Sequence, residues 1–169
     1  MAGCLEKKET EQTANNDEYN NYEYYDAQSL ITLANSGMSF EETYIVRRSF
    51  DLAAAQIYEE FYSTIDGTLT AVTLDADLEA KTFTLRFSDA SYTGEGSFEG
   101  EGLEWTSWES QSNHTDGTFV LSEDSKDADG IHTRKVGYGM TGDPEWTLVE
   151  ELTPLTEEEW DQLFSALPE

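Results

Sequence analysis

The sequence predicts a mainly β fold of antiparallel strands, with one helix at its C-terminus. Residues 81–87 alternate strictly between apolar and polar side chains, which is typical of a strand with one buried face. Similar short stretches follow as far as residue 152, separated by breaks rich in Gly and Asp. Their spacing, roughly 8–12 residues, is typical of antiparallel sandwiches and barrels.

Most strands are predicted from this alternation and from their β-branched residues. In chain order they are residues 43–50, 67–74, 81–87, 93–102, 103–109, 118–121, 131–138 and 145–152. Before them, residues 29–36 are predicted to form one or two helical turns, which Gly37 ends.

Residues 51–62 fit two structures. Asp51 could cap a helix, and the alanine run that follows it favours one. Alternatively, Ile57, Glu59 and Phe61 alternate as one face of a strand that ends at the turn Asp66-Gly67. Consistency with an all-β domain favours the strand, as part of a hairpin.

Four glycines occur within residues 93–102, which predicts bulges or sharp bends in the wall of a barrel. The glutamates between them would repel phosphate, which argues against a phosphate-binding loop. Trp105 and Trp108 follow, three positions apart. On a regular strand such residues face opposite sides, so one is expected in the core and the other outside.

The C-terminal helix has the strongest local signals. Thr156 and Glu159 form a capping box, and Leu155 and Trp160 form a hydrophobic staple. Apolar residues then follow at helical spacing up to Leu167. We therefore predict an amphipathic helix over residues 156–167 that docks on the sheet.

The N-terminal part of the chain differs in composition from the rest. Residues 1–28 are acidic, contain four closely spaced Tyr and have almost no aliphatic residues, which predicts a flexible tether. Residues 29–169 are then a single barrel domain. The chain has one cysteine, Cys4, so no intramolecular disulfide supports the fold.

The start Ala2-Gly3-Cys4 resembles the end of a bacterial lipobox. This resemblance implies that Cys4 is lipidated and that the protein is an exported, membrane-anchored lipoprotein of the bacterial cell envelope or cell surface. Membrane contact is expected only through this anchor, because no apolar run reaches the ~20 residues that a spanning helix needs.

The net charge of −27 limits the partners. Such a negative field repels nucleic acid and anionic membrane surfaces, which are bound by clustered Lys and Arg. Nucleic-acid binding is therefore excluded. The only adjacent arginines, Arg47 and Arg48, are expected to pair with carboxylates.

One stretch resembles a calcium loop. Asp124, Asp127 and Asp129 precede Gly130, and Asp127 and Asp129 are the candidate Ca²⁺ ligands. The position where an EF-hand has its bidentate Glu is Val136, so a solvated turn is the preferred interpretation and no cofactor is expected beyond a weak Ca²⁺ site.

A series of antiparallel strands followed by one docked helix, over residues 40–167, resembles the lipocalin or calycin architecture. The resemblance implies a closed up-and-down barrel that holds a small apolar molecule. The candidate ligand-binding residues are Phe83, Phe87, Trp105, Phe119, Trp146, Leu148 and Glu150. Glu150 interrupts an inward apolar face, so we expect it at the open end of the barrel or paired with a buried base.

Two functions from different classes remain open. The first is a lipid-anchored protein that binds a small apolar ligand inside the barrel. The second is a cell-surface structural or interaction protein whose barrel is packed and whose acidic face meets a protein partner. An enzyme is disfavoured, because the two histidines and single cysteine form no recognisable catalytic set.

Overall fold

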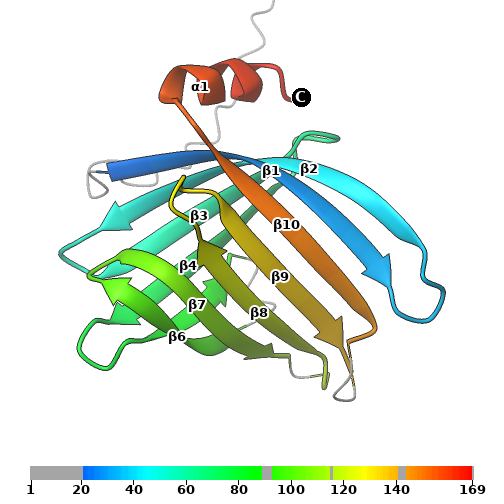
Figure 1. Ribbon diagram of the computed structural model, residues 1–169, viewed down its shortest axis with the longest axis horizontal. Coiled ribbons are helices and arrows are strands. Elements are labelled where there is room, and N and C mark those ends of the chain that lie inside the picture. Colours follow the sequence, from blue (N-terminus) through cyan, green and yellow to red (C-terminus); the bar gives the residue numbers. More distant parts are fainter. Residues whose placement is uncertain (1–20, 89–92, 115, 141–143, 169) are drawn as a thin grey trace, which may run out of the picture.

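The protein is a closed antiparallel barrel of ten strands with one helix at the C-terminal end (Figure 1). The computed structural model describes residues 21–88, 93–114, 116–140 and 144–168. Each strand pairs with its neighbours in the sequence, and β1 closes the barrel against β10. This confirms the predicted fold class. The barrel has no open sheet edge, because every strand is paired on both sides.

The elements are β1 (Asn21–Leu33), β2 (Ser39–Asp51), β3 (Gln56–Ser63), β4 (Leu69–Asp77), β5 (Thr82–Phe87), β6 (Thr93–Glu101), β7 (Glu104–Asn113), β8 (Phe119–Lys126), β9 (His132–Gly139), β10 (Trp146–Leu155) and α1 (Glu157–Ser165). Among the described residues, no helix has the length and apolar character needed to cross a membrane.

The barrel begins earlier in the chain than predicted. Strand β1 starts at Asn21, so residues 21–28, which were expected to belong to the tether, are part of the barrel wall. The helical turns predicted for residues 29–36 are wrong, since the strand continues to Leu33. Pairing with both β2 and β10 explains this result, because ladder hydrogen bonds on two sides outweigh a weak local preference. Residues 1–20 lie outside the described residues.

Residues 51–62 form a hairpin, as consistency with the sheet predicted. Asp51 caps a turn here: its Oδ1 accepts hydrogen bonds from the backbone N–H groups of Ala53 (2.9 Å) and Ala54 (2.8 Å). Ala55 then takes a positive φ of 53°, which ends any helical path, and β3 follows. Asp51 therefore acts as a cap, but it caps a turn and not a helix.

The two tryptophans of β7 lie on the same side of the sheet, contrary to the prediction. Trp105 pairs with Gly100 and Ser107 pairs with Glu99, so Thr106 is an extra residue in β7. Such a bulge reverses the alternation, and both Trp105 and Trp108 are buried in one apolar cluster. The glycine-containing residues 93–102 were predicted to carry bulges or bends; the register shift does occur opposite Glu99 and Gly100, but the extra residue belongs to β7.

This apolar cluster fills the barrel on the side of β3–β7. Its buried members are Ile57, Val72, Leu74, Phe83, Leu85, Phe98, Leu103, Trp105 and Trp108. Gly96 permits the dense packing, because a Cβ there would lie 2.3 Å from Cζ of Phe83. The carbonyl oxygen of Glu109 on β7 also lies 2.3 Å from that Cβ position, so only glycine leaves room here for both neighbours.

Helix α1 lies outside the barrel, next to β1 and β2 (Figure 1). The predicted capping box is present, with Glu159 N–H donating to Thr156 Oγ1 at 3.3 Å and Thr156 N–H donating to Glu159 Oε2 at 2.9 Å. Trp160 is the buried residue of the helix; its ring lies 5.3 Å from that of Tyr24. The Arg47 guanidinium lies 5.5 Å from the Trp160 ring, and the Phe164 ring packs edge-on against Tyr62 at 5.0 Å, so the helix docks through aromatic contacts.

Candidate functional site

The interior of the barrel changes in character along β1, β10, β9 and β8. These four strands pair in a continuous register, so the inward-facing residues form successive rows across them. The first row is Leu33, Trp146, Tyr138 and Val120, and the second is Ile31, Leu148, Val136 and Ser122. All eight side chains are half-buried, so they line space that solvent reaches. We call these two rows the open half.

The third row is polar and buried. It consists of Ser29, Glu150, Arg134 and Asp124, which are 3%, 4%, 6% and 4% exposed. The fourth row continues the burial with Ala27, Leu152 and His132. We call the third row the polar floor, because it separates the half-buried rows from the packed ones.

Arg134 is the centre of the polar floor. Its Nε donates to Asp124 Oδ2 at 3.2 Å, and its Nη2 donates to both Glu59 oxygens at 3.2 and 3.3 Å. The guanidinium also lies near two rings, 5.4 Å from the centroid of Phe61 and 5.2 Å from that of Trp108. Such contacts add cation–π attraction to the ion pairs and fix the plane of the guanidinium.

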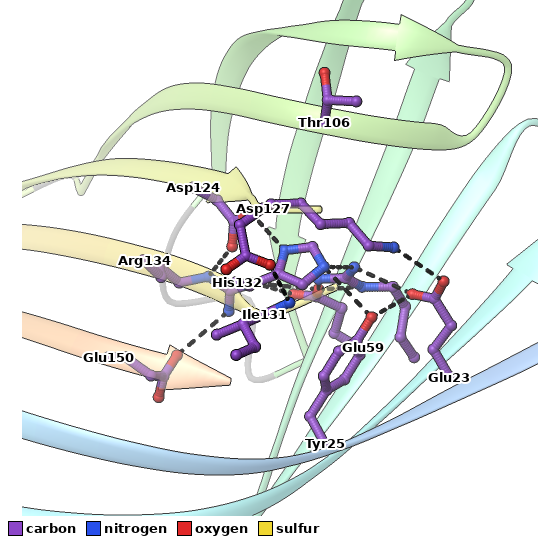
Figure 2. A network of polar contacts seen from close by, with 12 residues as sticks. Glu23, Tyr25, Glu59, Thr106, Asp124, Asp127, Ile131, His132, Arg134 and Glu150 are labelled. Carbon is purple, nitrogen blue, oxygen red and sulfur yellow. Dashed lines mark hydrogen bonds and ion pairs between the residues drawn. The ribbon is translucent and has the colours of Figure 1, made fainter. Parts of the chain in front are cut away.

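A second arginine continues the network beneath the floor. Arg48 Nε donates to Glu59 Oε1 at 2.7 Å, so Glu59 binds both arginines. Arg48 Nη1 lies 3.3 Å from His132 Nε2, and His132 Nδ1 lies 2.7 Å from Asp124 Oδ1. The Tyr25 hydroxyl also lies 3.3 Å from Nε2 of His132. When Arg48 donates to Nε2, Nδ1 carries the hydrogen that binds Asp124. Figure 2 shows these side chains converging inside the barrel.

The buried carboxylates of this network are held ionised by their partners. Burial acts to raise the pKa of Asp124, but the hydrogen bond from His132 and the charge of Arg134 outweigh it and lower the pKa to about 2. Burial likewise opposes ionisation of Glu59, and the charges of Arg134 and Arg48 lower its pKa below the ordinary value. Both groups are therefore anionic at neutral pH.

Glu150 is held less firmly. Ser29 Oγ donates to its Oε1 at 2.8 Å, while its Oε2 lies 3.7 Å from Arg134 Nη1, beyond hydrogen-bond reach. Burial dominates here and raises the pKa of Glu150, despite the opposing effects of Arg134 and Ser29. The expectation that Glu150 pairs with a buried base is met by Arg134, at this long distance.

The packed half below the floor holds little space. A cavity of about 30 Å³ lies among Arg48, Ile57, Glu59, Trp105 and His132. This volume is enough for about one or two water molecules and is far below the ~300 Å³ of small ligand sites.

Two shallow grooves lie on the barrel wall, with volumes of about 620 and 900 Å³. The larger is lined by residues of β6–β10 that include Leu121 and Val149, both exposed.

The structure separates the predicted ligand-binding residues into three groups. Trp146 and Leu148 lie in the open half, next to the predicted Glu150, and Phe87 is half-buried at the end of β5. Phe83 and Trp105 are buried in the packed cluster. Phe119 lies five residues before Asp124 on β8, so strand alternation places it on the opposite face, where it is nevertheless buried.

The candidate calcium residues form a turn. Asp127 Oδ1 accepts hydrogen bonds from the backbone N–H groups of Asp129 (2.9 Å) and Ile131 (3.0 Å). Asp124 is directed into the barrel, away from this turn (Figure 2). Across the described ranges of the chain, no group of His, Cys, Asp and Glu could hold a metal ion. A Ca²⁺ site at Asp127 and Asp129 gains no support from this geometry.

Sequence reasoning missed most of the polar network. Glu59, His132 and Arg134 were placed on strands, but their common interior position was not predicted. One signal was available in the sequence: His132 and Arg134 are two positions apart on one predicted strand, so both face the same side of the sheet.

Comparison of the chain with models of known protein families, and with curated proteins, found no match. The function proposed below therefore depends on the barrel and on the residues of its interior.

Proposed function

We propose that the protein binds a small apolar molecule in the open half of the barrel, above the polar floor. The observation that carries the proposal is the change in burial along β1, β10, β9 and β8. The same strands that are packed at Leu152 and His132 carry half-buried inward side chains at Leu148 and Trp146. A barrel packed throughout would bury both sets alike.

The chemistry of the open half fits an apolar ligand. Seven of its eight side chains are aliphatic or aromatic, and Ser122 is the exception. The rings of Tyr138 and Trp146 stack at a centroid distance of 5.2 Å, which gives the mouth of the barrel a flat aromatic wall. Binding sites for small molecules are typically lined in this way, with few polar groups.

The proposal includes export and a lipid anchor at Cys4. The support is the sequence Ala2-Gly3-Cys4 and the acidic segment that follows it. A direct test is membrane fractionation of a bacterium that expresses the chain behind a lipoprotein leader. The wild type should sediment with membranes, and Cys4→Ser should be released; equal membrane retention of the two would refute the anchor.

The second candidate is an interaction protein of the cell surface with a packed barrel. The tightly filled interior on the side of β3–β7 favours it, together with the net charge of −27, which suits a basic protein partner. The two candidates differ in whether the barrel takes up a small molecule.

Native mass spectrometry of the full chain, before and after organic extraction, tests uptake. The binding proposal predicts an extractable adduct of a few hundred daltons, or a one-to-one complex with the neutral probe N-phenyl-1-naphthylamine. A bare mass, with no uptake from a panel of neutral apolar compounds, would contradict the proposal and favour the interaction protein.

A further inference from the structure

Glu150 lies where the polar floor meets the open half. Its neighbour on the same face of β10 is Leu148, in the second row, and Leu148 is paired with Ile31 and Val136. All three are half-buried apolar residues. Glu150 is therefore the carboxyl group of the polar floor that would lie next to the inner end of an apolar ligand.

The buried charges of the network do not balance. Arg48 and Arg134 supply two positive charges, while Glu59, Asp124 and Glu150 supply three negative charges when all are ionised. His132 adds none when it is neutral, with Nε2 accepting from Arg48. At the rim, Glu23 and Lys126 pair with each other at 3.5 Å and cancel. With His132 neutral, one negative charge is left over.

The uncompensated negative charge lies on Glu150. Glu59 and Asp124 each accept hydrogen bonds from a guanidinium, whereas Glu150 accepts one from the Ser29 hydroxyl and meets Arg134 only at 3.7 Å. A carboxylate has about four acceptor positions, so Glu150 can accept further donors. Burial also raises the pKa of Glu150, because the charge of Arg134 and the hydrogen bond from Ser29 offset the loss of solvation only in part.

A positively charged group would supply that compensation. An anionic head group would instead add a second surplus negative charge inside the barrel, and the overall charge of −27 repels anions before they enter. A neutral hydroxyl could bind Glu150 but would leave the charge uncompensated.

We propose that the ligand has an apolar body and a single cationic head such as a primary amine, which pairs with the Glu150 carboxylate. This inference rests on the proposed function, because it needs a ligand in the open half. The ammonium donates to Glu150, and the apolar chain runs between Leu148, Ile31 and Val136 toward the mouth at Trp146.

The test compares three compounds with the same chain length and different head groups. Dodecylamine, 1-dodecanol and dodecanoate are titrated against N-phenyl-1-naphthylamine bound to the full chain at neutral pH. Dodecylamine should displace the probe at concentrations about tenfold lower than dodecanol, since a hydrogen bond between two charged groups is stronger than one from a neutral hydroxyl. Dodecanoate should be the weakest.

Two variants assign the preference to Glu150. In Glu150→Gln, the affinity for dodecylamine should fall to the affinity for dodecanol. The affinity for dodecanol itself should stay within about twofold of its value in the wild type. Glu151→Gln removes the same charge from the exposed outer face one residue later, and the amine preference should persist there. Circular dichroism establishes that each variant is folded. If Glu150→Gln does not fold, Glu150→Asp takes its place, because it moves the carboxylate back by one methylene.

The outcomes separate the two proposals. If dodecanol or dodecanoate binds as tightly as dodecylamine, or the amine preference survives loss of the Glu150 carboxylate, the cationic head is wrong and the apolar site remains. If neither the probe nor any of the three compounds binds, the proposed function itself fails.

Discussion

Arg134 on β9 donates two hydrogen bonds to Glu59 on β3, at 3.2 and 3.3 Å, across the interior of the barrel. The residues are 75 positions apart in the chain, and both are buried. This contact joins opposite walls through the polar floor. The packed half below the floor and the open half above it therefore share one rigid boundary.

Replacing Arg134 should cost much stability. Arg134→Met leaves Glu59 and Asp124 buried with fewer partners, and an uncompensated buried charge costs about 3–5 kcal/mol. The matched control is Arg86→Met, which removes an exposed arginine whose pair with Asp75 at 2.7 Å should contribute less than about 1 kcal/mol. Urea denaturation measures the free energy of unfolding of both variants. An equal decrease in the two would contradict the role assigned to Arg134.

Glu150 should make stability depend on pH above about 4.5. Its pKa in the folded protein lies above the ordinary value of 4.5, so the folded state holds the proton more tightly than the unfolded state. That contribution is present below pH 4.5 and is lost as the pH rises through the raised pKa. The groups that face Glu150 include Ser29, Arg134 and Tyr44, with Glu59 and Asp124 beyond them.

Glu150→Gln removes this titration. Its free energy of unfolding relative to wild type should therefore increase between pH 4.5 and neutral pH, as measured by urea denaturation across that range. Glu151→Gln, on the outer face, controls for the loss of one charge from a very acidic protein. A difference between Glu150→Gln and wild type that stays flat with pH would show that Glu150 is not destabilised by burial.

The bulge at Thr106 should be essential, although its side chain is exposed. Deleting Thr106 restores regular alternation and forces Trp105 or Trp108 out of the packed cluster, and losing a buried aromatic costs about 3–5 kcal/mol. Thr106→Ala keeps the extra residue and should change stability by less than about 1 kcal/mol. Tryptophan fluorescence and urea denaturation follow both variants; a deletion as stable as Thr106→Ala would contradict the bulge.

Much of the barrel could be predicted from the sequence because its strands are encoded locally. Alternation identified β5 and β10, and the capping box identified α1, since each signal lies within a few adjacent residues. Trp105 and Trp108 were misassigned because the extra residue that reverses their orientation is recognisable only from pairing with β6.

The polar floor was harder to predict for a related reason. Glu150 was recognised as an interruption of an apolar face, but its partners Arg134 and Ser29 come from other strands. An acidic chain offers many carboxylates, so composition alone does not distinguish Glu59 from its exposed counterparts. Closure of the barrel determines which of them meet an arginine.

Leu148→Trp should exclude a small apolar molecule from the open half. The added volume fills the second row, where Leu148 lies between Ile31 and Val136. Leu121→Trp is the control, because Leu121 is 40% exposed and lines the larger outer groove. Binding of N-phenyl-1-naphthylamine should be lost in Leu148→Trp and kept in Leu121→Trp. Unchanged binding in Leu148→Trp, or its loss only in Leu121→Trp, would contradict a site inside the barrel.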